Sequence, residues 1–402
     1  MKKHMVIICG IYYPEPSATG LCAKRYISLL KDYFDIELLC ISKTGTSQTL
    51  SVNIEGSNKE MVIHCLGRRK DSLKKGILKP VMYLHNGFEL KTKILGNLDW
   101  YKKEAYRELE NIHNNKKIDV IFSICSPMAA HCAAAQMKTT HPDIRCVAFT
   151  VDPYSSTNRI HSFGNGHAKL VEFENMTLRK FDSVLLSEEI FNHRKDLFND
   201  INNCLPLQYM LPDFDSDIFD DGYINQTGAI NCVYAGSLFK DVRNPEYLLK
   251  VFETLKDEKI YLHLYSFGCE KIIKKYADAL PNIKIHNCVS YNEIRGIYHT
   301  ADFLIGIGNN TNEIFPSKTF EYIVAQKPII YVNHDKLDNA VLRNHPQALQ
   351  ISDNDNIESS ASRVKMFCTE NKNSYIPKEQ LVDIYKKHSK ETILEILLKI
   401  CR

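Results

Sequence analysis

The chain has 402 residues, of which 44% are hydrophobic and 25% are charged, and its formal net charge at pH 7 is +3. This length suffices for two domains of ordinary size, and the composition is typical of a soluble globular protein. The near-neutral charge gives no reason to expect nucleic-acid binding, which usually needs a concentrated basic surface.

The chain contains 13 cysteines, and most of them lie within apolar runs, as Cys9 and Cys40 do. No two are spaced as Cys-x-x-Cys, so neither a zinc ribbon nor a thioredoxin motif is indicated. Buried, reduced thiols in a cytoplasmic protein are the better interpretation. No secretory signal is expected either, because the apolar run at 5–11 is short and lacks a cleavage site after it.

The chain begins with a strand–helix–strand pattern. Residues 5–11 predict a fully buried strand, residues 21–33 a helix, and residues 36–42 a second strand. Thr19 and Gly20 end the small-residue loop before this helix. The loop lacks the G-x-G-x-x-G pattern, so both a ligand-binding loop and an ordinary tight turn remain open.

Residues 67–103 form a basic segment that also contains Leu, Tyr, Phe and Trp side chains. Its first part, residues 67–79, holds six Lys and Arg residues against one acidic residue, Asp71. Such a segment could lie on an anionic bilayer, and the alternative is a solvated helical face.

Residues 120–137 carry no formally charged side chain and just reach transmembrane length. However, Ser126 followed by Pro127 is a signal for the start of a helix. We therefore predict a strand at 120–125 and then a buried, alanine-rich helix, not a membrane span.

Asp152 follows the next predicted strand, at 146–151, and is held by Pro153. Ligands bind at the carboxyl ends of strands in open α/β sheets, so Asp152 is a candidate substrate contact. The alternative is a turn-forming Asp before a proline. A stretch rich in Pro, Asp and Gly at 203–228 predicts an interdomain linker.

The second half opens with a predicted strand at 230–236 and a loop that carries Lys240 and Arg243. Two cations beside Gly236 and Ser237, at a strand–helix junction, can neutralise a diphosphate. The alternative is a pair of exposed loop cations. Further on, residues 335–360 are polar and show no clear period.

Two carboxylates, Glu313 and Glu321, lie eight positions apart. Between them an FPSK turn leads into a helical run that a proline ends, and apolar strands at 301–307 and 329–332 flank the unit. The loop therefore lies at the carboxyl end of a strand. The helix start, together with the charge of Lys318, favours a phosphate ligand.

This E-x7-E unit, with its helix and Lys-Pro-hydrophobic strand, resembles the donor site of retaining glycosyltransferases with two Rossmann-like domains (GT-B), most closely glycosyltransferase family 4 (group 1). The resemblance implies that Glu313 contacts the donor sugar and Glu321 the nucleotide ribose. Without it, both would be solvated surface residues. The other residues that it places at the substrate in this unit are Phe315, Pro316, Ser317, Lys318 and Thr319.

The resemblance extends to three other loops. The family usually has Gly-Arg-Leu and then Lys-Gly after the strand at 230–236; here Ser237 replaces the Arg, and Arg243 takes the place of the Lys. Cys288 and Val289 take the place where backbone groups hold the nucleobase. Thr19 and Gly20 stand where the family has a glycine pair near donor and acceptor, and Asp152 stands near an acceptor- or sugar-contacting position.

The implied fold class is α/β with GT-B architecture, which has two Rossmann-like domains, a central cleft and a C-terminal helix that crosses back. Residues 1–205 would form the acceptor domain, 206–228 the linker and 229–377 the nucleotide-sugar domain. Residues 378–402 would pack as a helix on the N-terminal domain.

The implied activity is transfer of a sugar from a nucleotide-sugar to a hydroxyl of a saccharide or lipid-linked acceptor, with retention, in polysaccharide or glycolipid synthesis. Its catalytic residues would be Glu313, Arg243, Lys240 and Asp152. The enzyme would be cytoplasmic or peripheral on the inner face of the cell membrane.

No metal or other cofactor is expected. The only Asp-x-Asp pair considered, Asp353 and Asp355, falls in the polar stretch outside the units that should form the site. Two other functions remain open, namely a nucleotide-sugar 2-epimerase of the same architecture and a non-catalytic nucleotide-sugar-binding protein.

Overall fold

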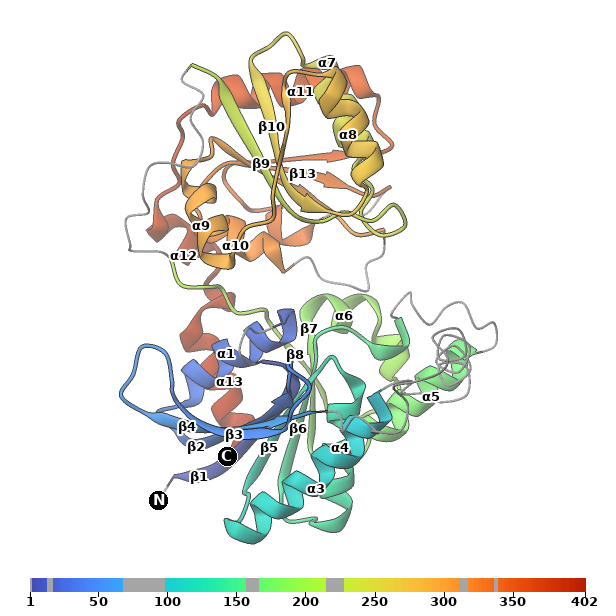
Figure 1. Cartoon of the computed structure of the whole chain (residues 1–402), viewed down its shortest axis with the longest axis vertical. Coiled ribbons are helices and arrows are strands. Elements are labelled where there is room, and N and C mark those ends of the chain that lie inside the picture. Colours follow the sequence, from blue (N-terminus) through green and yellow to red (C-terminus); the bar gives the residue numbers. More distant parts are fainter. Residues whose placement is uncertain are drawn as a thin grey trace, which may run out of the picture. The chain divides into compact units, whose positions relative to one another are not determined.

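The chain folds into two units, each built on its own sheet (Figure 1). The first unit is Met1–Met210 together with Lys390–Arg402, and the second is Leu211–Ser389. The computed structural model describes residues 2–12, 17–67, 98–156, 166–214, 228–310, 317–335 and 339–402. Glu313, Phe315, Pro316 and most of the basic segment therefore lie outside the described residues.

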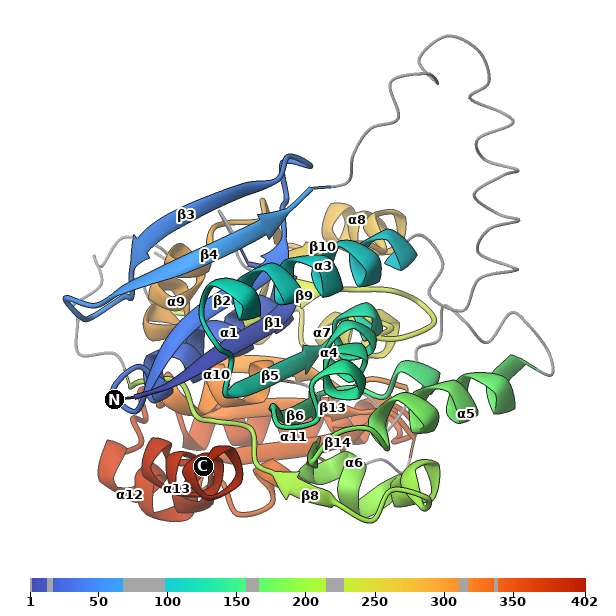
Figure 2. The ribbon, with the colours of Figure 1, turned by 90° about the horizontal axis from the view of Figure 1, so that it is seen from below.

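The first sheet is parallel except for the edge pair β3 and β4, which lie side by side as an antiparallel hairpin (Figure 2). The strand order reverses between the neighbours β1 and β5, as in a doubly wound sheet. In spatial order the strands are β3 (Gln48–Asn53), β4 (Glu60–Leu66), β2 (Phe34–Ile41), β1 (Lys3–Ile11), β5 (Val120–Cys125), β6 (Arg145–Thr150), β7 (Ser183–Ser187) and β8 (Cys204–Leu207).

Helices cover both faces of this sheet. Met5 and Ile7 of β1 pack with α1 and α13, whereas Val6 and Ile8, which point the other way, pack with α3 and α4. A strand buried on both faces must be apolar at every position, which explains the unbroken run in β1. The helices are α1 (Ala18–Leu30), α3 (Asp99–Asn115), α4 (Met128–Thr140), η2 (Tyr154–Ser156), α5 (Gly166–Leu178), α6 (Glu188–His193), η4 (Lys195–Phe198) and α13 (Lys390–Cys401).

The second sheet is parallel throughout, and its strand order reverses between β9 and β12. Helices α7, α8 and α11 cover one face, and α9, α10 and α12 lie together on the other (Figure 1). In spatial order the strands are β11 (Ile283–His286), β10 (Ile260–Phe267), β9 (Ile230–Ser237), β12 (Phe303–Ile307), β13 (Ile329–Asn333) and β14 (Ala348–Ser352). The helices are α7 (Glu246–Thr254), α8 (Glu270–Ala279), α9 (Tyr291–Thr300), α10 (Lys318–Val324), η5 (Ala340–Leu342), α11 (Ile357–Glu370), α12 (Lys378–Ile384) and η6 (Lys386–His388).

The structure confirms the predicted strand–helix units at the start of each unit, and the predicted strands and helix around Glu321. Residues 120–137 form β5 and then the start of α4, as predicted. Among the described residues, no helix is both long and apolar enough to cross a bilayer.

Two predicted segments differ in the structure. The tail from residue 378 is not one helix, because α12 packs on α10 in the second unit and only α13 belongs to the first unit. The break falls at Ser389, whose extended backbone (φ −69°, ψ 156°) cannot continue a helix. In addition, β8 lies within the stretch predicted to be a linker and pairs with β7.

Candidate functional site

The candidate site of the second unit lies at the carboxyl ends of β9 and β12, where the strand order reverses. At the end of β9, Gly236 has φ +152°, a conformation that side-chain-bearing residues rarely adopt. A Cβ atom at Gly236 would lie 3.2 Å from the hydroxyl oxygen of Tyr234 and 3.4 Å from Nζ of Lys318. The glycine therefore lets the ammonium group of Lys318 approach the backbone of β9.

Lys318, the first residue of α10, points back at the end of β9. Its Nζ donates a hydrogen bond to the carbonyl oxygen of Ala235 at 2.9 Å. Burial lowers the pKa of the Lys318 ammonium; the carboxylate of Glu321 opposes this, and the nearby guanidinium of Arg243 adds to the lowering. The guanidinium of Arg243 is thus close enough to Lys318 to disfavour the charged form of its ammonium group.

Arg243 is held between two loops. Its Nη2 donates to Oδ1 of Asn309 at 2.7 Å, and its Nη1 donates to the carbonyl oxygen of Ser237 at 3.5 Å. Nε of Arg243 is buried without a hydrogen-bond partner among the described residues. The guanidinium is therefore oriented by the fold, and its buried Nε–H donor is not used by any described residue.

We call Arg243 and Lys318, with Gly236, Ser237 and Asn309 around them, the basic cluster. Repulsion between two fixed, partly desolvated cations is relieved when an anion binds between them. Arginine and lysine are the side chains that bind phosphate, the former through a planar fork and the latter as a point charge. Because α10 has only seven residues, its dipole is small, and the charged side chains make the larger contribution to anion binding here.

The other residues predicted in the E-x7-E unit divide between surface and interior. Glu321 is half-buried in the first turn of α10, near enough to Lys318 to affect its pKa. Ser317 precedes the helix without capping it through its side chain. Thr319 is buried, and its hydroxyl accepts a hydrogen bond from Nδ2 of Asn339 at 3.0 Å, so it belongs to the interior of the unit.

Two predicted contacts come from the loop after β11. Cys288 and Val289 are both exposed there. The thiol of Cys288 lies near enough to Lys318 to act on its pKa. The loop thus borders the basic cluster on the β10–β11 side of the sheet.

Lys240, which was predicted to share the diphosphate with Arg243, lines a separate cavity of about 110 Å³ together with Asp353. Asp353, which was expected to fall outside the units that form the site, directly follows β14 at the carboxyl edge of the sheet. Asp355 does serve the fold, since its Oδ2 accepts bonds from the backbone N–H of Ser352 and from Arg363.

In the first unit, the predicted residues lie at two strand ends of that unit's sheet. Gly20 is buried in the first turn of α1, where its N–H donates to Oγ of Ser17 at 3.2 Å, and the hydroxyl of Thr19 lies 3.2 Å from the same oxygen. Asp152 is half-exposed just after β6.

Glu174, on α5, was not predicted, although it anchors the turn after Asp152. Its carboxylate accepts hydrogen bonds from the N–H groups of Tyr154 and Ser155, at 2.8 and 3.0 Å, and from the Ser155 hydroxyl at 2.8 Å. Burial raises its pKa, while these bonds lower it. A lone Glu in an amphipathic helix gives no sequence signal for such a role.

No model of a protein family matches the sequence, and no curated protein matches it. Solved structures do. Sucrose-phosphate synthase from Thermosynechococcus elongatus superposes with a TM-score of 0.70 at 8% identity, covering 99% of this chain and 98% of that one. An α,α-trehalose 6-phosphate synthase from Burkholderia multivorans gives a TM-score of 0.65 at 10% identity, covering 100% and 98%. A glycosyltransferase from Rickettsia africae gives a TM-score of 0.58 at 12% identity, covering 100% and 98%.

The fold is GT-B. The predicted fold class, with its two Rossmann-like sheets, is therefore confirmed over the full length of the chain. At such low identity the likeness establishes the fold and not the reaction, which has to be argued from the residues of the site.

Proposed function

We propose that the chain is a retaining glycosyltransferase that transfers a sugar from a nucleotide-sugar to an acceptor hydroxyl, and that it resembles family 4. The observation that carries the proposal is the basic cluster. It sets an oriented guanidinium and a half-buried ammonium around a glycine, at the strand reversal of a GT-B fold. The second unit would bind the donor and the first unit the acceptor.

In the proposed reaction, the bond between the anomeric carbon and the diphosphate oxygen breaks, the acceptor oxygen bonds to the same face of that carbon, and the proton of the acceptor hydroxyl passes to the departing diphosphate. Negative charge develops on the departing diphosphate. Arg243 and Lys318, already oriented by Asn309 and the Ala235 carbonyl, would stabilise that charge without reorganising. Protein cations would then perform the task that a divalent metal performs in other transferases.

Several residue roles rest on the family resemblance. Glu321 would bind the nucleotide ribose, and Cys288 and Val289 would border the base. Glu313 would contact the sugar, and Asp152 the acceptor or the sugar. If so, Glu313→Gln lowers the transfer rate more than it weakens binding of a nucleoside diphosphate, which lacks the sugar. Equal losses would exclude the sugar-side role.

The test of the function is a panel of nucleoside diphosphates and nucleotide-sugars, first by calorimetry and then with saccharide and lipid-linked acceptors. We expect saturable nucleotide binding and formation of a new glycosidic bond with retained configuration. Isomerisation of the nucleotide-sugar would identify an epimerase instead. Binding without turnover would identify a binding protein, and no nucleotide binding at all would refute the proposal.

The acceptor determines where such an enzyme works. If it is lipid-linked, the basic segment at 67–103 would hold the enzyme on the anionic inner face of the cell membrane. Reversing the charges of Lys74 and Lys75 should then reduce binding to anionic liposomes at low salt. Failure of the unmodified protein to bind such liposomes would mean that the segment is only a solvated face.

A further inference from the structure

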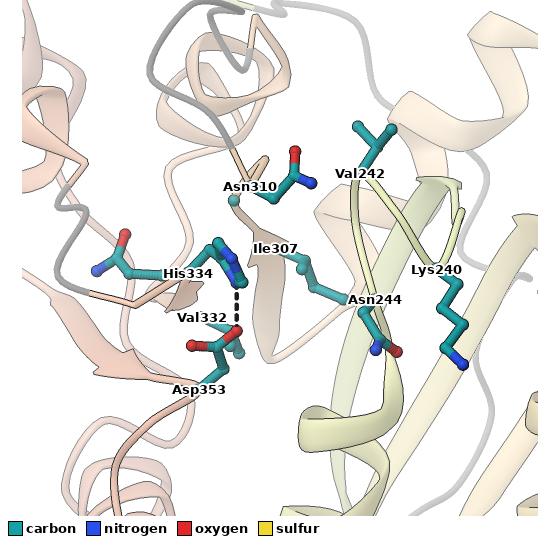
Figure 3. Close-up of a pocket in the computed structure, with 10 residues that line it drawn as sticks. Lys240, Val242, Asn244, Ile307, Asn310, Val332, His334 and Asp353 are labelled. Carbon is teal, nitrogen blue, oxygen red and sulfur yellow. Dashed lines mark hydrogen bonds and ion pairs between the residues drawn. The ribbon is translucent and has the colours of Figure 1, made fainter. Parts of the chain in front are cut away.

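The second unit has a cavity whose lining does not include Arg243 or Lys318 of the basic cluster. It has a volume of about 110 Å³ and lies beyond the carboxyl ends of β12, β13 and β14. Its polar wall is formed by Lys240, Asn244, Asn310, His334 and Asp353, and apolar side chains of Ile307 and Val332 contribute to the lining (Figure 3).

The cavity is separate from the basic cluster. Asn309 bonds to Arg243 in the cluster, while its neighbour Asn310 lines the cavity. The backbone N–H of Asn310 donates to the carbonyl oxygen of Val242 at 2.9 Å, and its side-chain amide donates to the carbonyl oxygen of Asp241. These hydrogen bonds join the loop after β9 to the loop after β12. Different side chains of the two loops contribute to the basic cluster and to the cavity.

One wall of the cavity is a histidine oriented by a carboxylate. Nδ1 of His334 lies 2.5 Å from Oδ2 of Asp353, the contact that is dashed in Figure 3. A carboxylate can only accept, so Nδ1 carries a proton, and Nε2 is the ring nitrogen that does not face Asp353. The side chain of His334 is 46% exposed, and no described residue bonds to Nε2. Nε2 is thus left for a ligand.

The loop that carries His334 is held in an unusual conformation. Asp335 has φ +51°, which is rare for a residue with a side chain. Its N–H donates to Oδ1 of Asp353 at 2.7 Å, and its carbonyl oxygen accepts from the Ser352 hydroxyl at 2.5 Å. Strained backbone of this kind persists where the surrounding bonds fix it, and it occurs often at ligand sites.

The amides on the opposite wall supply complementary groups. Oδ1 of Asn244 accepts from the N–H of Glu246 at 3.0 Å, so its NH₂ remains a donor. The amide nitrogen of Asn310 is used by Asp241, so its carbonyl oxygen remains an acceptor. Within the described residues, the cavity therefore offers donors from Lys240 and Asn244, an acceptor from Asn310, and Nε2 of His334 as a further hydrogen-bonding group.

The charges of the wall exclude most ligand classes. One ammonium and one carboxylate nearly cancel, so a phosphate would meet the repulsion of Asp353 with a single cation to oppose it. A metal ion lacks ligands, since no group of three or more His, Cys, Asp or Glu side chains among the described residues could hold one. Alternating donors and acceptors above an apolar floor suit a neutral ring that bears hydroxyl groups.

We propose that this cavity binds a neutral sugar ring through His334, Asp353, Asn244, Asn310 and Lys240. Its volume corresponds to several water molecules, which fits one ring and not an oligosaccharide. The sugar could be a free saccharide, as acceptor or effector, or the sugar of the nucleotide donor. With a free saccharide the inference goes beyond the proposed function, because such binding requires no nucleotide; with the donor sugar it rests on the proposed function and adds residues to the donor site.

The test is saturation-transfer NMR and calorimetry on the whole protein. The probes are a panel of neutral monosaccharides, a nucleoside diphosphate alone, and nucleotide-sugars with the same base. The variant is Asp353→Asn, and the matched control is Asp355→Asn, which changes a carboxylate two residues away that faces Ser352 and Arg363. Thermal melts establish that both variants fold, and His334→Gln provides a second variant that leaves the carboxylate in place.

We expect Asp353→Asn and His334→Gln to weaken sugar binding by about ten-fold or more, the scale of hydrogen bonds to a charged group, and to leave nucleoside diphosphate binding unchanged. Loss of affinity for free monosaccharides would identify a free-saccharide site. Loss of affinity for nucleotide-sugars alone would assign the cavity to the donor sugar. Unchanged sugar binding in both variants, an equal loss in the Asp355→Asn control, or an equal loss for the bare diphosphate would overturn the proposal. Failure of the proposed function would appear separately, as absence of diphosphate binding in the unmodified protein.

Discussion

The two sheets share a winding pattern, yet their carboxyl edges differ in charge. At the first sheet, the predicted site residues are the neutral Thr19 and Gly20 and the acidic Asp152, beside a turn anchored by the carboxylate of Glu174. At the second, the reversal carries Arg243 and Lys318. The topology thus provides two similar places for a ligand, and the side chains determine which of them can hold a diphosphate.

Arg243→Ala is the substitution with the largest expected effect, and it tests whether the difference in charge between the two edges matters for activity. We expect the barrier to transfer to rise by about 2.7–4 kcal/mol, because a charge-stabilising donor is lost, and nucleoside diphosphate binding to weaken as well. Steady-state rates and calorimetry measure the two effects. Lys250→Ala, which removes a cation from the exposed surface of α7, is the control. Full activity of Arg243→Ala would show that the charge difference between the edges has no catalytic meaning.

Glu321→Ala tests whether the second edge also holds the ribose. Nucleoside diphosphate affinity should fall by about 1.5–3 kcal/mol, the usual scale for a hydrogen bond to a charged group. Calorimetry on a nucleoside diphosphate and on pyrophosphate separates ribose from phosphate contacts. A similar loss for pyrophosphate would mean that Glu321 acts through Lys318 and not on the ribose.

A smaller effect, on stability and dependent on pH, is expected in the first unit. His64 lies 2.8 Å from Glu37 and 2.9 Å from Glu108. Burial opposes the charged form of His64, but its bonds to Glu37 and its interactions with Glu108 outweigh this, so its pKa is raised above 6.5. The close contact of His4 and the hydrogen bond of His64 lower the pKa of Glu37 to about 2.

A raised folded-state pKa means that the stabilisation from His64 is complete below the unfolded-state value and is lost as the pH rises through the folded-state value. The destabilisation caused by His64→Ala should therefore be largest at about pH 5–6 and shrink above pH 7. Chemical denaturation of both proteins across this range measures it. The second unit, which lacks this cluster, serves as internal control, and a pH-independent difference would contradict the assignment.

The smallest expected effect is that of a chelator. If Arg243 and Lys318 neutralise the diphosphate, transfer should continue unchanged in EDTA. Loss of activity that magnesium or manganese restores would show that the basic cluster is insufficient and that the charge difference between the edges must be completed by an ion.

Strands buried on both faces were readable from the sequence, because each is an unbroken apolar run, as in β1 and β13. Edge strands were not. In β3, half-buried and exposed positions alternate without an apolar run, and in β14 only Ile351 is buried. Because β14 was taken as irregular, Asp353 was placed away from the ligand-binding edge.

The site was predicted to a similar extent. The sequence indicates Arg243 and Lys318 as candidates because they lie at a strand end and at a helix start, but Asn309, which orients Arg243, has no charge and no motif. Lys240 was grouped with Arg243 because the two are close in sequence, whereas the side chain of Lys240 lines the cavity and that of Arg243 bonds to Asn309. A loop of eight residues, 238–245, is long enough to send side chains in two directions, and the sequence does not show which residue points in which direction.

The first unit is assembled from two separated parts of the chain, since α13 packs on α1 and β6, and Nε of Arg145 donates to the carbonyl oxygen of Ile400 at 3.0 Å. Ile393 and Leu397 of α13 are fully buried in its core. At roughly 5–20 residues per second, the ribosome needs on the order of ten to forty seconds to make Leu211–Ser389 before α13 appears. During synthesis the second unit can therefore complete its core before the first unit does. Until α13 is made, the apolar surface of the first unit that Ile393 and Leu397 cover stays exposed. That surface is available for a chaperone to bind.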